Sequence, residues 1–279
     1  MNKASQIFSE GKEILRLGGI EAYAFDAACL FLHFCGIERA EIAFCEKNVE
    51  NGREFIKACE KRAGGYPLQY ILGNWEFYGL EFSLSEGVLI PRADTETLID
   101  FVLENFGGKL SILDMCCGSG CIGLTLKKHL PSADVTLCDI SSTALDVTGK
   151  NAKALGASVR ILKADLLCGF EKYFREESFD IIISNPPYIK SEDMKTLSKE
   201  VLCEPALALD GGEDGMTFYT ALCEKWQGAL KAGGVLILES GYDTAEDIVT
   251  LMTELCYSDI RTRRDLGGNT RMVAGTKPL

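Results

Sequence analysis

The chain has 279 residues, of which 47% are hydrophobic and 25% charged, so it can bury the core of one large domain or of two smaller ones. Its 41 acidic side chains outnumber its 29 basic ones, which disfavours a protein that grips nucleic acid non-specifically and favours a protein or a cationic small molecule as partner. No stretch comes near the roughly 20 apolar residues that span a bilayer, and charges interrupt the N-terminal segment too often for a signal peptide. We therefore expect a cytoplasmic protein that contacts no membrane.

The 12 cysteines form no C-x-x-C pair, and the chain has only two histidines, His33 and His129. This spacing is poor for a zinc site and for a disulfide framework. We expect mostly buried, reduced thiols and no bound metal.

The first 63 residues or so carry apolar residues at helical spacing, with helix ends expected at Gly36 and at Gly64. Residues 66–96 are rich in aromatic and β-forming side chains with interspersed glycines, which predicts a short β-hairpin that links two domains. With the boundary near residue 73, the sequence predicts a small helical domain over residues 1–72 and a larger domain over residues 73–279.

From about Leu110, short apolar runs alternate with helical patterns. Strands are expected at residues 110–116, 134–139, 158–165, 179–184 and 235–240, helices at 120–129, 143–155, 215–234 and up to 255, and a closing pair of strands at 258–264 and 270–276. This alternation is typical of βαβ units and of an α/β fold with a largely parallel sheet covered on both faces. Ligands of such sheets bind at the carboxyl ends of the strands.

The first candidate site is "ILDMCCGSGCIG", in which Gly118, Gly120 and Gly123 form a G-x-G-x-x-G pattern between a strand and a helix. By itself the pattern fits a tight turn, a dinucleotide cradle or the nucleoside pocket of S-adenosylmethionine. Asp114 ends the strand, and a carboxylate there receives a cationic group, such as an α-amino group, better than a pyrophosphate. Asp114 therefore favours S-adenosylmethionine.

Two further carboxylates end the next two strands. Asp139 can accept hydrogen bonds from both ribose hydroxyls of a nucleoside, a position that enzymes using nicotinamide cofactors also employ. An equal alternative is that Asp139 caps the helix that follows it. Asp165 is placed similarly on the third strand and could take an adenine amino group.

The third candidate is "SNPPYI" at the end of the apolar run "FDIII". Asn185 offers a side-chain carbonyl, and Pro186 directs neighbouring backbone carbonyls into the crevice, so that together they can accept both hydrogens of an –NH₂ group. Tyr188 offers an aromatic wall. The motif favours an acceptor that is a planar amide or an exocyclic amine, held in line with a reactive methyl group. The alternative is a Pro-Pro turn that only closes the strand.

These residues resemble the class I S-adenosylmethionine-dependent methyltransferases that modify planar or amide nitrogens. More narrowly, the chain from about Asp26 to its end resembles the HemK/PrmC protein-glutamine methyltransferases, through "PLQYILGNWEFYGLEF", "VLIPRADTE", "ILDMCCGSGCI", "FDIIISNPPYI", "EPALALDGGEDGM", "LILESGY" and "RDLGGNTRMV". The resemblance implies a Rossmann-like sheet whose C-terminal strand is antiparallel. It also implies a substrate, the glutamine of the Gly-Gly-Gln motif in bacterial peptide chain release factors, whose side-chain amide nitrogen receives one methyl group.

The resemblance also assigns roles to residues. S-adenosylmethionine would lie on the loop of Cys116, Cys117, Gly118, Ser119 and Gly120, with its ribose on Asp139, its adenine beside Leu166 and its methionine end near Arg92. The glutamine would be clamped by Asn185, Pro186, Pro187 and Tyr188, and Asn185 would contact the cofactor as well. The helical domain would help to hold the release factor, with a monomer as the default state and no direct contact with nucleic acid.

The chain departs from the family pattern at two positions. Glycine is usual where Cys116 stands, and an aromatic residue is common where Leu166 stands. Cys116 is small enough for the turn if its φ angle is negative, so we expect cofactor binding to survive this departure. We expect Leu166 to cover the adenine by apolar contact. Glu204 and Glu239 match family positions, but the sequence assigns them no chemical role.

The sequence leaves two alternative functions open. A methyltransferase acting on adenine or cytosine of nucleic acid would use the same clamp on an exocyclic amine, but it needs a basic groove and a way to extrude the base. The excess of acidic over basic residues favours the protein substrate. A nucleoside-binding or nicotinamide-dependent protein explains the glycine pattern and leaves "NPPY" unexplained.

Overall fold

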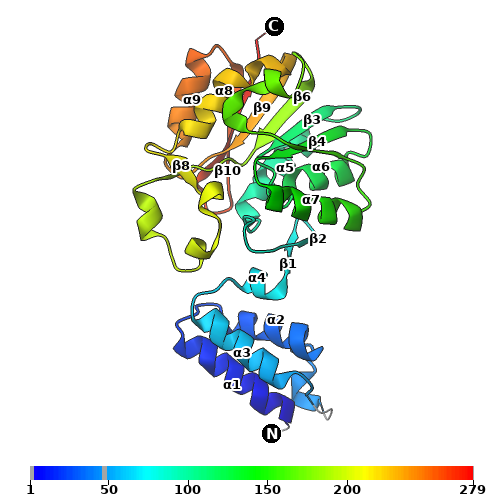
Figure 1. The fold of residues 1–279 in the computed structure, drawn as a ribbon, viewed down its shortest axis with the longest axis vertical. Coiled ribbons are helices and arrows are strands. Elements are labelled where there is room, and N and C mark those ends of the chain that lie inside the picture. The colour runs from blue at the N-terminus through cyan, green and yellow to red at the C-terminus, as the bar shows by residue number, and fades with distance from the viewer. Residues whose placement is uncertain (1–2, 46–48, 279) are drawn as a thin grey trace. The chain divides into compact units, whose positions relative to one another are not determined.

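The computed structural model describes residues 3–45 and 49–278, and these form two compact units. The helical unit comprises the chain up to Asn74 together with Ser198–Cys203, and the sheet unit comprises Trp75–Leu197 and the chain from Glu204 onward (Figure 1). The sequence placed the boundary near residue 73 and did not foresee that Ser198–Cys203 belongs to the helical unit. Among the described residues, no helix combines the length and apolarity needed to cross a bilayer.

Aromatic rings hold the helical unit together. Its helices are α1 (Lys3–Leu17), α2 (Tyr23–Cys35), α3 (Gly52–Ala63) and α4 (Leu68–Leu72). Phe31 is fully buried and meets the rings of Phe8 and Phe55 edge-on, with centroid distances of 5.4 and 4.9 Å. Such edge-to-face pairs add about 1 kcal/mol each to the burial of the rings.

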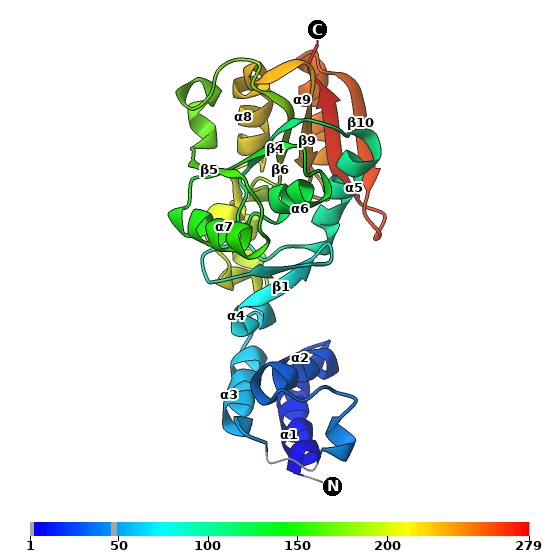
Figure 2. The ribbon, with the colours of Figure 1, turned by 90° about the vertical axis from the view of Figure 1, so that its right-hand side faces the viewer.

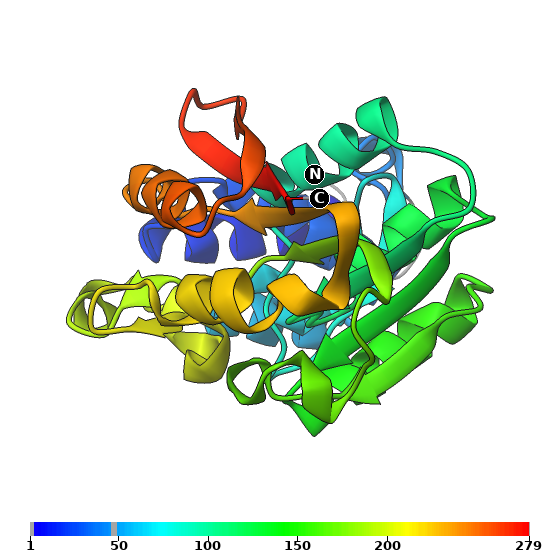
Figure 3. The same ribbon diagram turned by 90° about the horizontal axis from the view of Figure 1, so that it is seen from above.

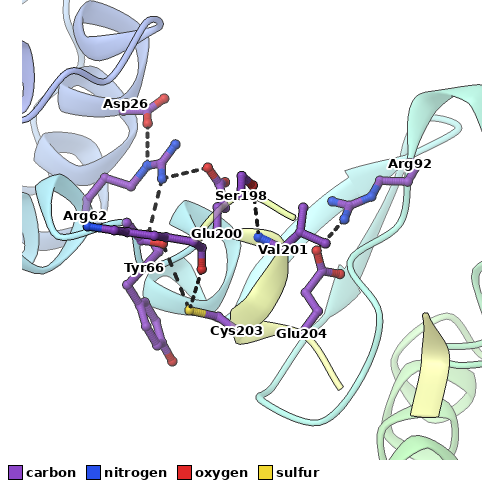
Figure 4. Close-up of polar contacts among 11 residues, drawn as sticks. Asp26, Arg62, Tyr66, Arg92, Ser198, Glu200, Val201, Cys203 and Glu204 are labelled. Carbon is purple, nitrogen blue, oxygen red and sulfur yellow. Dashed lines mark hydrogen bonds and ion pairs between the residues drawn. The ribbon is translucent and has the colours of Figure 1, made fainter. Parts of the chain in front are cut away.

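A buried ion pair also links the helices of this unit. The Arg62 guanidinium donates to the Asp26 carboxylate at 2.7 Å, and both residues are less than a tenth exposed (Figure 4). Arg62 also donates to Glu200 at 2.9 Å, which ties the segment Ser198–Cys203 to the helices.

We expect Asp26→Ala to lower the free energy of unfolding of the helical unit by about 3 kcal/mol, because it leaves a buried guanidinium with Glu200 as its remaining carboxylate partner. Native-state hydrogen exchange of the amides in α1 and α3 measures the change. Glu13→Ala, which breaks the exposed pair with Arg16, is the matched control and should leave exchange unchanged. Equal exchange in the two variants would contradict the prediction.

A tight hairpin begins the sheet unit, as the sequence predicted. Its strands are β1 (Asn74–Phe77) and β2 (Leu80–Ser83), and the two residues between them, Tyr78 and Gly79, have φ angles of 51° and 71°. Positive φ at both positions suits a two-residue turn between twisted antiparallel strands. The hairpin buries Phe77 and Phe82 in the core of the unit.

The main sheet has seven strands in the order β10-β11-β9-β6-β3-β4-β5. Their bounds are β3 Ser111–Met115, β4 Asp134–Asp139, β5 Arg160–Lys163, β6 Phe179–Ser184, β9 Leu230–Glu239, β10 Ser258–Arg264 and β11 Thr270–Thr276. The five strands from β9 to β5 are parallel, and β11 runs antiparallel to both of its neighbours. The predicted α/β fold with a mostly parallel sheet and an antiparallel C-terminal strand is confirmed.

Helices cover both faces of this sheet (Figures 2 and 3). One face is covered by α5 (Glu96–Asn105), α6 (Cys121–His129) and α7 (Ser142–Ala154), and the other by α8 (Thr217–Lys225) and α9 (Ala245–Glu254). Successive strand residues alternate between the two cores: Ile181 and Ile183 face the first, whereas Ile182 faces the second. Because both faces are buried, these strands appear in the sequence as continuous apolar runs.

One element was predicted wrongly. The helix expected at residues 215–234 ends at Lys225, a short 3₁₀ turn follows at Gln227–Ala229, and β9 already begins at Leu230. Leu230 pairs with Phe179 in the parallel neighbour β6, so pairing in the sheet overrides the helical spacing of the apolar residues. The sequence also missed the short parallel pair β7 (Ile189–Lys190) and β8 (Asp210–Gly212).

The cysteines are free thiols, but fewer are buried than expected. Four are buried and five partly buried, whereas Cys168, Cys203 and Cys256 are exposed. In the described part of the chain, no three His, Cys, Asp or Glu side chains gather as metal ligands do.

Candidate active site

A pocket with a volume of about 190 Å³ lies at the carboxyl ends of β3, β4, β5 and β6, within the sheet unit. Ten of the predicted site residues line it: Arg92, Cys116, Cys117, Gly118, Ser119, Asp139, Asp165, Leu166, Asn185 and Pro187. Four others, Asp114, Gly120, Pro186 and Tyr188, are not among its lining residues. The pocket thus brings together predicted residues that are distant in sequence, from Arg92 to Pro187.

The loop after β3 curves because several of its residues have positive φ angles. Cys116, Gly118 and Gly120 have φ angles of 61°, 56° and 81°. Cys116 therefore does not meet the condition of a negative φ angle under which it was expected to fit the turn. Glycine adopts this region without steric cost, whereas a residue with a Cβ atom is strained there by about 1 kcal/mol.

This strain leads to a stability prediction. We expect Cys116→Gly to unfold with a free energy about 1 kcal/mol higher than Cys116→Ala, because both variants remove the thiol and only glycine relieves the backbone. Thermal or urea unfolding of the two variants, compared with the wild type, measures the difference. Equal stability of the two variants would mean that the positive φ carries no cost.

Asp139, at the end of β4, is held by two backbone amides. Its two carboxylate oxygens accept hydrogen bonds from the N–H groups of Gly118 and Ser141, both at 2.9 Å. The side chain of Ser141 caps α7 by accepting from Ala144 at 3.2 Å, so the capping role considered for Asp139 belongs to Ser141. Burial raises the pKa of Asp139. Each oxygen keeps a lone pair that can accept a hydroxyl from the pocket.

Asp165 and Leu166 form part of the wall after β5. Asp165 accepts the N–H of Leu167 at 2.9 Å and so caps the short turn Leu166–Cys168. Leu166 is buried, and its carbonyl accepts the indole N–H of Trp226 at 2.8 Å. Leu166 therefore presents a fixed apolar surface to the pocket.

The segment after β6 places Asn185 at the pocket through two anchors. The Ser184 hydroxyl, fully buried, donates to the carbonyl of Met115 at 2.6 Å and fastens β6 to β3. The Asn185 amide nitrogen donates to the Thr95 hydroxyl at 3.4 Å. Beyond the two prolines, the N–H of Ile189 donates to the carbonyl of Leu209 at 2.9 Å, where β7 pairs with β8.

Glu204 holds the segment that carries Arg92. Its carboxylate accepts the backbone N–H of Ile90 at 3.0 Å and forms an ion pair with the Arg92 guanidinium (Figure 4). The Glu204 side chain is fully buried, whereas that of Arg92 is 39% exposed. The buried Glu204 carboxylate thus fixes the direction in which the Arg92 side chain extends from the backbone.

Comparisons with known proteins agree along nearly the whole chain. Residues 92–236 match the methyltransferase small domain, and residues 6–73 match the PrmC N-terminal domain. The release factor glutamine methyltransferase of Clostridium botulinum is 34% identical over 96% of this chain and 97% of the relative. That of Moorella thermoacetica is 36% identical over 95% of both chains. The chain belongs to the release factor glutamine methyltransferase family.

Solved structures show the same fold as this methyltransferase. A methyltransferase from Pyrococcus furiosus superposes with a TM-score of 0.56 over 72% of this chain and 91% of that one, at 20% identity. The 16S rRNA N2 G1207 methyltransferase of T. thermophilus superposes with a TM-score of 0.50 over 73% of this chain and 49% of that one, also at 20% identity. The predicted class I methyltransferase fold is confirmed.

Within the methyltransferase, Asp114 lies behind the loop and not at the pocket surface. It is fully buried, and one of its oxygens accepts the N–H of Gly123 at 2.8 Å, while the other finds no hydrogen-bond partner among the described residues. Burial raises its pKa to about 8. A Cβ atom on Gly123 would lie 2.9 Å from this carboxylate, which explains the third glycine of the pattern. A direct contact of Asp114 with a cationic ligand stays a prediction.

Sequence reasoning missed part of the pocket. From the segment 87–95 it singled out only Arg92, yet Val88, Leu89, Pro91 and Thr95 also line the pocket. Glu239, at the end of β9, is not among the lining residues; it accepts a hydrogen bond from Thr95 at 2.5 Å and is 1% exposed. Its position at a strand end could be inferred from the sequence, because such strand ends meet at one edge of the sheet, whereas its bond to Thr95 could not.

Proposed function

We propose that this methyltransferase transfers a methyl group from S-adenosylmethionine to the side-chain amide nitrogen of the glutamine in the Gly-Gly-Gln motif of peptide chain release factors. One observation carries the proposal: the Asn185 amide and the Asp139 carboxylate line one pocket of a chain that belongs to this family. A nucleoside-binding carboxylate and an amide-binding clamp on one pocket fit a cofactor and an amide acceptor.

The residues present suit S-adenosylmethionine. Asp139 has acceptor positions for ribose hydroxyls, and Leu166 has an apolar surface that suits an adenine ring. Asp165 and Arg92 both line the pocket, and we assign the adenine amino group to Asp165 and the carboxylate of the methionine part to Arg92. When bound, the cofactor supplies an electrophilic methyl group. The role of this chain is to hold the acceptor nitrogen still in front of it.

Asn185 acts on the acceptor. An amide nitrogen is a poor nucleophile because its lone pair is delocalised, so alignment has to provide much of the rate. The Asn185 carbonyl can accept one N–H of the substrate amide, and a backbone carbonyl of the Pro186 segment can accept the other. These bonds strengthen as positive charge develops on the nitrogen, and each such interaction is worth about 3 kcal/mol in transition-state stabilisation. The methylated amide then loses its proton readily, so no strong base is required.

We propose that Tyr188 forms an aromatic wall beside the clamp. Burial raises the pKa of Tyr188 to about 12, so its ring remains a neutral phenol at physiological pH. Its backbone packs so tightly that a Cβ atom on Gly211 would lie 2.6 Å from the Tyr188 Cα atom. This packing supports a fixed position for the segment that follows Asn185.

The helical unit is proposed to hold the release factor. Its match to the PrmC N-terminal domain and the net charge of −12, which suits a basic or neutral protein partner, support this assignment. Action in the cytoplasm as a monomer, without direct contact with nucleic acid, remains a prediction.

The test is methyl transfer from labelled S-adenosylmethionine to an unmethylated bacterial release factor. The same factor with the Gly-Gly-Gln glutamine replaced by alanine, and double-stranded DNA, serve as parallel acceptors. Label on the intact factor alone would support both the reaction and the acceptor residue. Label on DNA would mean that the clamp binds an exocyclic amine, and label on no acceptor would refute the proposed function.

A further inference from the structure

We infer that Thr95 and Glu239 are positioning residues that decide which end of the Asn185 amide faces the acceptor. The inference rests on the proposed function for its consequence, and on hydrogen bonds within the sheet unit for its geometry. Asn185 accepts a substrate N–H only when its oxygen points into the pocket. A half-turn of the amide would present its NH₂ group instead and would repel the substrate amide hydrogens.

The hydrogen-bond chain fixes this choice. The Thr95 hydroxyl has one hydrogen, and it donates this hydrogen to the Glu239 carboxylate at 2.5 Å. Toward Asn185, Thr95 therefore offers only lone pairs, and the Asn185 amide N–H donates to its hydroxyl oxygen at 3.4 Å. An ionised carboxylate can only accept hydrogen bonds, so Glu239 sets the direction of both bonds. The Asn185 oxygen is thereby directed away from Thr95.

Thr95 and Glu239 are both held in the protein interior. Thr95 is 2% exposed and Glu239 is 1% exposed. Thr95 lies in the short helix Ala93–Thr95 before α5, whereas Glu239 ends β9, next to β6 in the sheet. The chain of bonds thus joins three segments that are distant in sequence and converge beside the pocket.

Protonation of Glu239 would reverse the chain. A neutral carboxyl donates its own hydrogen to Thr95, whose hydroxyl is then free to donate to the Asn185 oxygen and to favour the unproductive orientation. Burial raises the pKa of Glu239 to about 7, and the charged groups that act on it are Arg271, Arg92 and Asp94, with the titratable groups Tyr188, Tyr219 and Cys121 nearby. We expect kcat to fall as the pH drops below about 7.

The first test compares Thr95→Val with Thr95→Ser. Valine keeps the shape and removes the hydroxyl, and we expect kcat to fall at least about 10-fold with the KM for the release factor changed less than kcat. Serine keeps the hydroxyl and should retain activity within about 3-fold of the wild type. Wild-type activity in Thr95→Val, or equal losses in both variants, would overturn the inference.

A second test varies the acid. Glu239→Gln retains an acceptor oxygen for Thr95 and cannot be titrated, so its kcat should stay flat between pH 6 and 8, where the wild type declines toward the acidic side. If the kcat of Glu239→Gln falls toward pH 6 as steeply as that of the wild type, the proposed role of Glu239 is refuted.

A third measurement does not need methyl transfer. The side-chain amide hydrogens of Asn185, identified in ¹⁵N spectra by their loss in Asn185→Asp, should exchange with water at least about 10-fold faster in Thr95→Val than in wild type or Thr95→Ser. If these hydrogens exchange at the same rate in Thr95→Val as in the wild type, the inference is overturned, even if the enzyme is active. The wild type could instead show the expected exchange pattern and transfer no label to the release factor. That result would refute the proposed substrate and still support the positioning of Asn185.

Discussion

Replacing Asn185 by alanine should lower kcat for release factor methylation by at least about 100-fold while leaving the Kd for S-adenosylmethionine within about 3-fold of the wild type. In the proposed mechanism the amide side chain acts mainly on the acceptor: it orients the glutamine nitrogen and stabilises the charge that forms there. Asn185 lines the pocket, and its nitrogen donates to Thr95, which supports the proposal that its carbonyl faces the acceptor.

Single-turnover transfer and calorimetric titration of the cofactor measure the two quantities separately. Asn185→Asp is measured as a second variant, because aspartate has a side chain of the same size with an acceptor oxygen but lacks the N–H that donates to Thr95. Full activity of Asn185→Ala would refute the clamp mechanism. A large loss of cofactor affinity would instead assign Asn185 to the cofactor.

Replacing Asp139 by alanine should raise the Kd for S-adenosylmethionine by about 100-fold, since hydrogen bonds to a charged group are worth about 1.5–3 kcal/mol. Two ribose hydroxyls would lose their acceptor. The N–H groups of Gly118 and Ser141, which now bind this carboxylate, would also lose their partners, and the loop after β3 would lose its support.

Calorimetric titration with S-adenosylmethionine measures the Kd of each variant, at a temperature well below the unfolding temperature of that variant. Asp146→Ala is the matched control: it removes the same charge from an exposed position of α7 and should bind the cofactor like the wild type. If Asp139→Ala and Asp146→Ala have equal Kd values, the ribose lies elsewhere.

Much of the architecture followed from local sequence. The apolar runs at residues 110–116, 134–139 and 179–184 predicted buried strands because residues on both faces of a covered sheet are apolar, and these strands are present as β3, β4 and β6. The turn at Tyr78 and Gly79 lies between short aromatic strands, as hairpin turns do. Patterns within a few residues decide such elements, so they can be inferred from sequence.

The pocket was only partly predictable. The glycine pattern and "NPPY" indicated the correct strand ends, since parallel strands meet at one edge. Backbone angles could not be inferred: Cys116 has a φ of 61° although cysteine rarely adopts it, because the surrounding loop determines the conformation. For the same reason, Asp114 lies behind the loop, where Gly123 in the first turn of α6 donates its N–H to the carboxylate.

The sequence by itself determined most helices and strands of the main sheet, the glycine loop and the position of "NPPY" after a buried strand, because each depends on residues that are neighbours along the chain. Only the tertiary structure decided that Ser198–Cys203 belongs to the helical unit and that Thr95 lies between Asn185 and Glu239, positions separated by up to 144 residues. Those contacts depend on the placing of β9 beside β6 and on where each loop returns to the sheet. No periodicity of apolar residues encodes such long-range pairing, so the orientation of the Asn185 amide became visible only in the folded protein.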